Sequence, residues 1–260
     1  MNSHFPIPTY SLYARFGCAI CFFDPMTDPI LSHPKNPCEV HLSARDLRRS
    51  FKIGSRQIDV LRGISLDVHR GESVFLIGAS GAGKTTLLYT LAGLERPESG
   101  TVTFEGRELY SGGERAQART RNERMGFVFQ GYFLLPELTA LENVMLPMMI
   151  DRRASREAAA CALERVGLKD RQHHLPAEMS GGEQQRVAIA RAIINDPSVI
   201  FADEPTGNLD SKTGETIVDL LLALVRENQK TLLVVTHDAR LAGRGDRKVE
   251  IEDGLLKSEA

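Results

Sequence analysis

Residues Gly78 to Thr85 read Gly-Ala-Ser-Gly-Ala-Gly-Lys-Thr and match the pattern G-x-x-x-x-G-K-[ST] at every fixed position. Glycines let such a loop curl so that successive backbone N–H groups point at phosphate oxygens, and the start of a following helix adds partial positive charge. Lys84 would reach the β- and γ-phosphates, and the Thr85 hydroxyl would bind Mg²⁺. The apolar run at 73–77 and the leucine spacing in 86–92 predict the flanking strand and helix. The loop predicts a nucleoside triphosphate site; a glycine-rich turn that binds nothing is the alternative.

Two adjacent carboxylates, Asp203 and Glu204, follow the apolar run 199–202. Acids at the end of a buried strand have no packing role, whereas in P-loop proteins the first holds Mg²⁺ and the second can polarise the attacking water. A structural Asp-Glu pair at a turn is the alternative. Another apolar run, 232–236, leads to His237. A lone histidine is usually structural, but this one is expected at the same edge of the sheet as the two acids.

The residues Ser180-Gly181-Gly182-Glu183 stand at the start of a helix predicted to run to about Ile194. Ser180 and Glu183 have the spacing of a capping box. Each of the two glycines in the first turn costs about 1 kcal/mol of helix stability relative to alanine. Such a cost is reasonable where bare backbone must approach a ligand, and anions bind well at helix N-termini. The segment therefore predicts both a cap and a ligand contact.

Composition limits the classes of function. A chain of 260 residues with 42% hydrophobic and 25% charged residues is ordinary for a globular protein of one large or two small domains. A formal charge of −2 gives no global electrostatic reason to bind nucleic acid. No apolar run approaches the length of a membrane-spanning helix, so a role at a membrane would need a separate partner.

Residues 1–39 differ from the rest because prolines interrupt them and no periodicity survives. We expect an irregular, disordered extension or a start codon assigned too far upstream. A cleaved secretory signal is a poorer match, because a single arginine precedes its short apolar patch. Reduced thiols are favoured over a zinc site, because no common finger has the spacing of Cys18, Cys21, His33 and Cys38.

From Val40 onward the pattern becomes regular. The polar, arginine-rich stretch 115–124 is typical of a solvated helix or loop. The stretch 45–55 has little pattern, and Phe51 is its one aromatic residue. The remaining predicted elements are strands at 40–42, 64–68, 100–106 and 126–130 and an amphipathic helix at 155–166.

Taken together, these motifs resemble those of the nucleotide-binding subunit of ATP-binding cassette (ABC) transporters, across roughly Val40 to Leu256. The most specific match is the signature Met-Ser-Gly-Gly-Glu-Gln-Gln-Arg at 179–186, in which Met179 replaces the usual leucine. The resemblance also makes Phe51 the best match to the aromatic that stacks on adenine. The other matches are Gln130 to the Q-loop glutamine, Asp203 to the metal-binding acid, Glu204 to the catalytic glutamate, Gly207–Asp210 to the D-loop and His237 to the switch histidine.

This resemblance implies an α/β fold: a P-loop NTPase with a RecA-like α/β core, an antiparallel β subdomain and an inserted helical subdomain. The ATPase domain would span 40–257, with the helical subdomain at about 131–185. ATP and Mg²⁺ would bind, with Thr85, Gln130 and Asp203 at the metal. Glu204, His237 and Gln130 would act in catalysis. The implied nucleotide-binding residues are Phe51, Gly78, Ser80, Gly81, Ala82, Gly83, Lys84, Thr85, Thr86, Ser180, Gly181, Gly182, Glu183 and Asp210.

The resemblance also implies that one chain cannot complete the reaction. Two copies would pair head to tail, each P-loop facing the other copy's signature helix with ATP between them. ATP hydrolysis would then drive separate transmembrane permease subunits, with the ATPase bound peripherally at the cytoplasmic face of the inner membrane. No nucleic-acid partner is expected.

The segments 129–144 and 148–150 are similar to the lipoprotein-releasing (LolD-type) and macrolide-exporter (MacB-type) branch. Because the sequence ends soon after Gly254, we expect no C-terminal regulatory domain of the kind that several importer ATPases carry. Two alternatives stay open. One is a regulatory ATPase, like the cell-division ATPase FtsE, that moves a membrane partner without transport. The other is a DNA-maintenance ABC ATPase, which the absence of a coiled-coil or zinc insertion disfavours.

Overall fold

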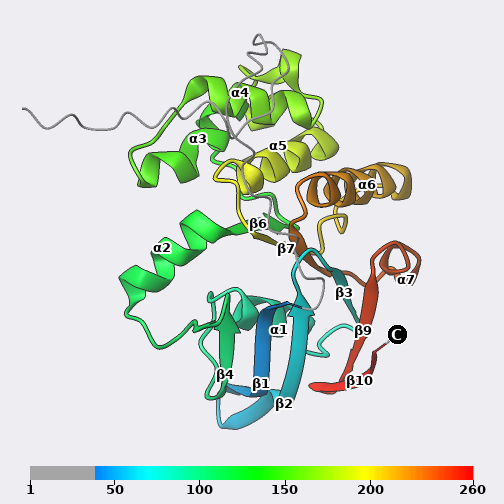
Figure 1. Ribbon diagram of the computed structural model, residues 1–260. Helices are drawn as coiled ribbons and strands as arrows, with labels where there is room; N and C mark the ends of the chain where they lie inside the picture. The colour runs from blue at the N-terminus through cyan, green and yellow to red at the C-terminus, as the bar shows by residue number, and fades with distance from the viewer. Residues whose placement is uncertain (1–38, 260) are drawn as a thin grey trace, which may run out of the picture. The chain divides into compact units, whose positions relative to one another are not determined.

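Two β-sheets carry the architecture of this protein (Figure 1). The structure is a computed structural model, and it describes residues 39–259. The expectations for Cys18, Cys21 and Cys38, and for all but the last residue of the 1–39 extension, lie outside the described residues. Within 39–259, no helix combines the length and the apolar composition needed to cross a membrane.

The larger sheet has six strands in the order β10-β9-β3-β8-β7-β6, and all neighbours are parallel except β10 and β9. The three central strands β3, β8 and β7 are mainly apolar and largely buried, as expected for parallel strands covered on both faces. The strands are β3 (Ser73–Ile77), β6 (Met125–Phe129), β7 (Val199–Asp203), β8 (Thr231–Val235), β9 (Arg247–Glu252) and β10 (Leu255–Glu259).

Alternation along these strands divides the interior into two cores. Phe75 and Ile200 belong to the core that also contains residues of α5 (Gly181–Ile193) and α6 (Ser211–Glu227). The next residues along the same strands, Leu76 and Phe201, belong to the core shared with α1 (Lys84–Leu91) and the smaller sheet. Because side chains of a strand point alternately to opposite faces, each strand is packed from both sides. The predicted α/β fold is confirmed in this sheet.

The smaller sheet is antiparallel, in the order β2-β1-β4-β5. Its first hairpin includes the stretch 45–55, for which the sequence analysis predicted no element. In the structure this stretch forms the end of β1 and the turn that leads to β2. Register shifts interrupt the pairing between Ala44 and Ser50, and Asp46 has φ 46°. Such bulges break the two-residue alternation by which a strand is recognised. The strands are β1 (Val40–Ile53), β2 (Arg56–His69), β4 (Ser99–Phe104) and β5 (Arg107–Glu108).

Three helices, α3 (Ala140–Ile150), α4 (Arg156–Arg165) and α5, pack on one another (Figure 1). Ser155 caps α4 by accepting a hydrogen bond from the Ala158 N–H, which places its start within one residue of the expected start. The arginine-rich stretch forms the exposed helix α2 (Glu114–Arg124). Short elements complete the chain: the 3₁₀ turns η2 (Lys169–Arg171) and η3 (Pro176–Glu178) and the helix α7 (Ala239–Ala242). The 131–185 limits of the helical subdomain stay a prediction.

A polar junction joins the two sheets. His41 on β1 is buried, and its ring contacts both sides of the junction. The distance from its Nδ1 to Thr231 Oγ1 on β8 is 2.6 Å, and the distance from its Nε2 to Glu105 Oε1 is 3.3 Å. Arg124, at the end of α2, donates to the same glutamate oxygen at 2.6 Å. Hydrogen bonds from His41 and then Arg124, together with the arginine's charge, hold the pKa of the Glu105 carboxyl well below its usual range. Glu105 is therefore an ionised link between the sheets.

We predict that Glu105→Gln lowers the free energy of unfolding at pH 7 by about 1–3 kcal/mol, because it leaves the Arg124 guanidinium without its carboxylate partner. The folded-state pKa is depressed, so the carboxylate's contribution is present above the unfolded-state pKa of about 4.3 and is lost as pH falls below it. Urea denaturation should therefore show a gap between wild type and variant that narrows progressively as the pH falls below about 4. The control is Glu108→Gln, an exposed glutamate on the next strand. Equal stability of the two variants at pH 7 would contradict the junction.

Candidate functional site

The loop between β3 and α1 has the conformation that its glycines permit. Gly78 has φ 148°, and a Cβ there would lie 2.1 Å from the Ile251 carbonyl oxygen. Gly83 has φ 100°, and a Cβ there would lie 2.7 Å from the Val60 carbonyl oxygen. Gly81 also has a positive φ of 80°, but a Cβ would meet nothing within 4 Å. Packing therefore requires the outer glycines, while Gly81 lies beside open space at the tip of the loop.

Lys84 is the first residue of α1, and its side chain folds back under this loop. Its Nζ donates hydrogen bonds to the carbonyl oxygens of Gly78 at 2.9 Å and Ala79 at 2.8 Å. The residue is only 6% exposed. A buried ammonium is stable only when its donors are paired, and the loop carbonyls provide that pairing. The loop is thus shaped around a positive charge that phosphate oxygens can share.

Asp203 ends β7 and lies against the same helix. Its Oδ1 accepts a hydrogen bond from Thr85 Oγ1 and its Oδ2 one from Tyr89 OH, both at 2.9 Å. Burial raises the pKa of the Asp203 carboxyl, while the hydrogen bonds from Tyr89 and Thr85 act to lower it. Magnesium prefers oxygen ligands, and the neighbouring oxygens of Thr85 and Asp203 supply two. The predicted metal-binding pair fits the ion.

Glu204 and His237 follow two neighbouring strands, β7 and β8. The Glu204 N–H donates to the Val235 carbonyl oxygen at 3.0 Å, and the residue has φ 43°. This left-handed conformation turns the chain directly after Asp203, so consecutive acids point in different directions. The Glu204 Oε2 lies 3.1 Å from His237 Nδ1. The structure therefore brings these two predicted catalytic residues into contact.

Gln130 follows the last residue of β6 and is paired with the D-loop. Its Nε2 donates to Asn208 Oδ1 at 3.3 Å, and Asn208 Nδ2 donates to the Gln130 carbonyl oxygen at 2.9 Å. A Cβ at Gly207 would lie 2.6 Å from Gln130 Nε2, so a side chain at this position would displace the Gln130 amide from Asn208. The predicted Q-loop and D-loop residues are thus joined within one chain.

The signature segment forms the predicted capping box at the start of α5. Glu183 accepts hydrogen bonds from the Ser180 N–H and hydroxyl, and these bonds lower the pKa of the Glu183 carboxyl. A Cβ at Gly181 would lie 2.9 Å from the Tyr132 hydroxyl oxygen, and one at Gly182 would lie 2.7 Å from Thr213 Cγ2. The two glycines therefore have a packing reason within the chain, which the sequence analysis did not foresee.

Asp210 has a local role as the N-cap of α6. It accepts hydrogen bonds from the Thr213 N–H at 3.0 Å and hydroxyl at 2.6 Å, which fixes the first turn of that helix beside Gly182.

Phe51 lies on β1 opposite Ile58, and the guanidinium carbon of Arg49 is 4.9 Å from its ring centroid. A cation on a ring is a stabilising contact. The adenine contact of Phe51 stays a prediction.

The parallel strands β3, β8, β7 and β6 are neighbours in the sheet, so the P-loop, His237, both acids and Gln130, which follow their carboxyl ends, lie at one edge of the sheet. Ligands in such sheets bind at this edge. The signature residues are placed differently: within 39–259, no hydrogen bond or ion pair joins 180–183 to the loop 78–85. The chain alone therefore presents two separate parts of the predicted site.

Two residues at this edge were missed. Arg191 on α5 donates from Nη1 to the Phe133 carbonyl oxygen and from Nη2 to the Tyr132 carbonyl oxygen, each at 2.6 Å. Burial lowers the pKa of its guanidinium. Tyr89 stands among the leucines of α1 and appeared in the sequence only as part of an apolar helix. No spacing rule signals either contact, because both join segments far apart in the chain.

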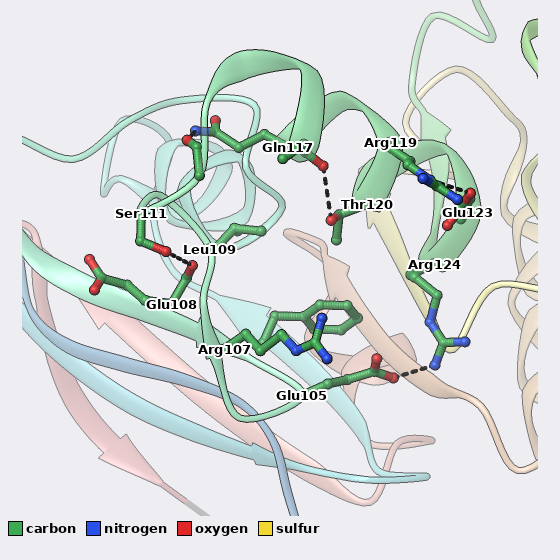
Figure 2. Close-up of a pocket in the computed structure, with 13 residues that line it drawn as sticks. Glu105, Arg107, Glu108, Leu109, Ser111, Gln117, Arg119, Thr120, Glu123 and Arg124 are labelled. Carbon is green, nitrogen blue, oxygen red and sulfur yellow. Dashed lines mark hydrogen bonds and ion pairs between the residues drawn. The ribbon is translucent and has the colours of Figure 1, made fainter.

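A cavity of about 670 Å³ lies elsewhere, between the turn after β4 and helix α2 (Figure 2). Charged side chains surround it, including Glu105, Arg107, Glu123 and Arg124. None of the predicted site residues lines this cavity. It is separate from the carboxyl edge of the central sheet.

A glycine loop wrapped around a lysine, joined through a helix threonine to the aspartate of another parallel strand, defines a P-loop nucleoside triphosphatase. A family model described as ABC transporter matches residues 61–207. The chain belongs to this ABC transporter family, as its ATP-binding subunit.

Similar curated proteins cover most of the chain. It is 50% identical over 218 residues to the lipoprotein-releasing system ATP-binding protein LolD of Pseudomonas fluorescens, over 83% of this chain and 96% of that one. It is 48% identical over 227 residues to the uncharacterized ABC transporter ATP-binding protein YbbA of Escherichia coli K12, over 86% of this chain and all of that one.

Solved structures agree with the fold. The dimeric ATP-binding cassette MJ0796 in a post-hydrolysis state, bound to ADP and Pi, superposes with a TM-score of 0.78 at 38% identity. That match covers 84% of this chain and 97% of the other. The predicted ABC cassette fold, the identification as an ABC ATPase and ATP hydrolysis as its reaction are therefore confirmed. ABC cassettes similar to this chain form dimers.

We predict that Glu204→Gln binds ATP with little change but lowers turnover at least about a hundredfold, because glutamine cannot accept a proton from water. ATP would then persist in the site, and the variant should elute as a dimer on size-exclusion chromatography with ATP. Wild type should return to monomer as ATP is consumed. Undiminished ATPase activity would exclude Glu204 as the catalytic base.

A second prediction separates the two explanations for Gly182. Gly182→Ala should lower the melting temperature because its Cβ meets Thr213, and Thr213→Ser should restore it by removing Cγ2. The serine keeps the hydroxyl that donates a hydrogen bond to Asp210. If bare backbone is also needed at a phosphate, the double variant should still dimerise poorly with ATP. A stable double variant that dimerises like wild type would mean that packing alone explains the glycine.

Proposed function

We propose that this protein is the ATPase subunit of a lipoprotein-releasing or MacB-type export complex, bound at the cytoplasmic face of the inner membrane by separate permease subunits. The observation that carries the proposal is an apolar groove next to the Q-loop. The likeness to LolD proteins supports the branch, and two residues of the segment 129–144, Phe129 and Phe133, line the groove.

The groove has a volume of about 440 Å³ and lies among α2, β6, α3 and α5. Aromatic and aliphatic side chains dominate its lining: Leu94, Phe127, Phe129, Phe133, Pro147 and Ile150. Two of them are unusually accessible for apolar residues, Phe133 at 66% and Ile150 at 73% exposed. Exposed apolar patches mark interaction sites, and an apolar helix or loop of a permease has the matching chemistry. Gln130 follows Phe129 directly, so an occupant would lie close to the ATP site.

Two copies would complete the ATP site. The signature residues of one copy would face the P-loop of the other, with Ser180 and the amides of Gly181 and Gly182 directed at the γ-phosphate. This arrangement accounts for a chain whose signature and P-loop are not in contact. Dimeric cassettes of similar fold support it.

Each copy would contribute defined groups to hydrolysis. Lys84 would exchange its bonds with the loop carbonyls for phosphate oxygens. Thr85 and Asp203 would hold Mg²⁺, with Gln130 on release from Asn208. Mg²⁺, when bound, would neutralise charge on the phosphates. Glu204 would accept the proton of the attacking water, and His237, at 3.1 Å, would orient this carboxylate and the γ-phosphate.

The partner can be identified directly. Tagged Glu204→Gln protein, recovered from detergent-solubilised membranes in the presence of ATP, should carry a permease with a large periplasmic domain and few transmembrane helices. A many-helix importer permease with a solute-binding protein would overturn the branch but not the ATPase chemistry. Recovery of no membrane protein would overturn the membrane role.

The groove can be tested in the same assay. Ile150→Lys places a charge in the apolar lining and should reduce permease recovery at least about tenfold, with ATP binding unchanged. Val40→Lys is the matched control, because Val40 is also an exposed apolar residue, at 40%, but lies on β1. Equal recovery with both variants would contradict the groove as the docking site.

A further inference from the structure

The Asp203 carboxylate is held at both oxygens by one helix. Thr85 donates to Oδ1 and Tyr89 to Oδ2, each at 2.9 Å. The two donors are four residues apart on α1, so they lie on the same face of the helix. The carboxylate of β7 therefore lies across this face and receives one donor from each of two successive turns.

Two hydrogen-bond donors fix the orientation of the Asp203 carboxylate, which a single donor would leave free to rotate. The side-chain torsion of an aspartate carboxyl is broad, so a single hydrogen bond permits the group to turn. The second bond, from Tyr89, fixes the plane and keeps Oδ1 beside Thr85, where the metal is proposed to bind. It also pairs an oxygen that burial removes from water, and an unpaired charged acceptor there would be costly.

Tyr89 is in turn oriented by a row of aromatic rings. Its ring meets Phe129 edge to face, with centroids 6.3 Å apart. Phe129 meets Phe133 in the same manner at 5.2 Å. Phe129 and Phe133 both line the apolar groove. Edge-to-face pairs have defined geometry, so these contacts connect the groove to the Tyr89 hydroxyl and through it to Asp203.

We propose that Tyr89 is a positioning residue that holds the Asp203 carboxylate in the orientation required by magnesium–ATP, and that Phe129 sets the position of Tyr89. The occupant of the groove then acts on the metal carboxylate by a route separate from Gln130. This inference rests on the proposed metal role of Asp203. Outer partners of ligating carboxylates are known to affect metal affinity by about 10–100-fold.

The test is Tyr89→Phe, which removes only the hydroxyl. Binding of a fluorescent ATP analogue to the isolated protein is measured during a Mg²⁺ titration and in EDTA. We expect the Mg²⁺ concentration at half-saturation to rise about tenfold, with nucleotide affinity in EDTA unchanged. Saturating Mg²⁺ should restore kcat. Mn²⁺ binding in the presence of nucleotide, followed by electron paramagnetic resonance, should weaken by the same factor.

Tyr110→Phe is the matched control. The Tyr110 hydroxyl donates to the carbonyl oxygens of Thr90 at 2.6 Å and Glu95 at 2.5 Å, so it supports the end of the same helix without reaching Asp203. Its loss should lower stability and leave the Mg²⁺ half-saturation within twofold of wild type. An equal shift in both tyrosine variants would overturn the inference, as would no shift in Tyr89→Phe.

A double-mutant cycle with Phe129→Leu tests the link to the groove. If Phe129 acts through Tyr89, the double variant should shift the Mg²⁺ half-saturation no further than Tyr89→Phe alone. Additive shifts would overturn the link. Asp203→Asn distinguishes a failure of this inference from a failure of the proposed metal site. If nucleotide binding by Asp203→Asn still depends on Mg²⁺ as in wild type, both the metal site and the role of Tyr89 are overturned. If Asp203→Asn loses this dependence while Tyr89→Phe keeps it unchanged, only the role of Tyr89 is overturned.

Discussion

The hydrogen bond between Thr85 and Asp203 is the contact on which the arrangement of the site depends. It joins the helix after β3 to the end of β7, although β8 lies between these strands. Strands separated by one neighbour lie about 10 Å apart, so the side chains must span the end of β8. The same edge carries the contact between Glu204 and His237, which follow β7 and β8.

The same edge explains why the chain works as a pair. The signature glycines pack against Tyr132 and Thr213, and this packing holds the start of α5 beside the Q-loop and α6 rather than against the P-loop. A helix N-terminus can receive an anion from outside the chain even when it carries a capping box. In the proposed dimer, that anion is the phosphate bound by the other copy. Tight internal packing of the signature and its availability to a partner are therefore compatible.

The sequence predicted the parts of the fold that depend on local chemistry. The P-loop, the capping box and the buried strands ending in Asp203 and near His237 were recognised because their spacing itself sets the structure. The hairpin around Phe51 was not, because bulges destroy its alternation. Tyr89 and Arg191 were also missed. Their partners lie 114 and 58–59 residues away, and no local pattern encodes such contacts.

Arg191 shows how the groove and the signature can move together. Tyr132 and Phe133 have φ of 58° and 47°, a conformation that costs about 1–3 kcal/mol for such residues. The Arg191 guanidinium binds both of their carbonyl oxygens, and that charge offsets the strain. Arg191 belongs to α5, whose first turn is the signature. In the proposed complex, a permease segment that displaces Phe133 would either break these bonds or move α5, and a movement of α5 would reposition the signature against the second copy. In the proposed complex, α5 would thus connect the groove at one end to the signature at the other.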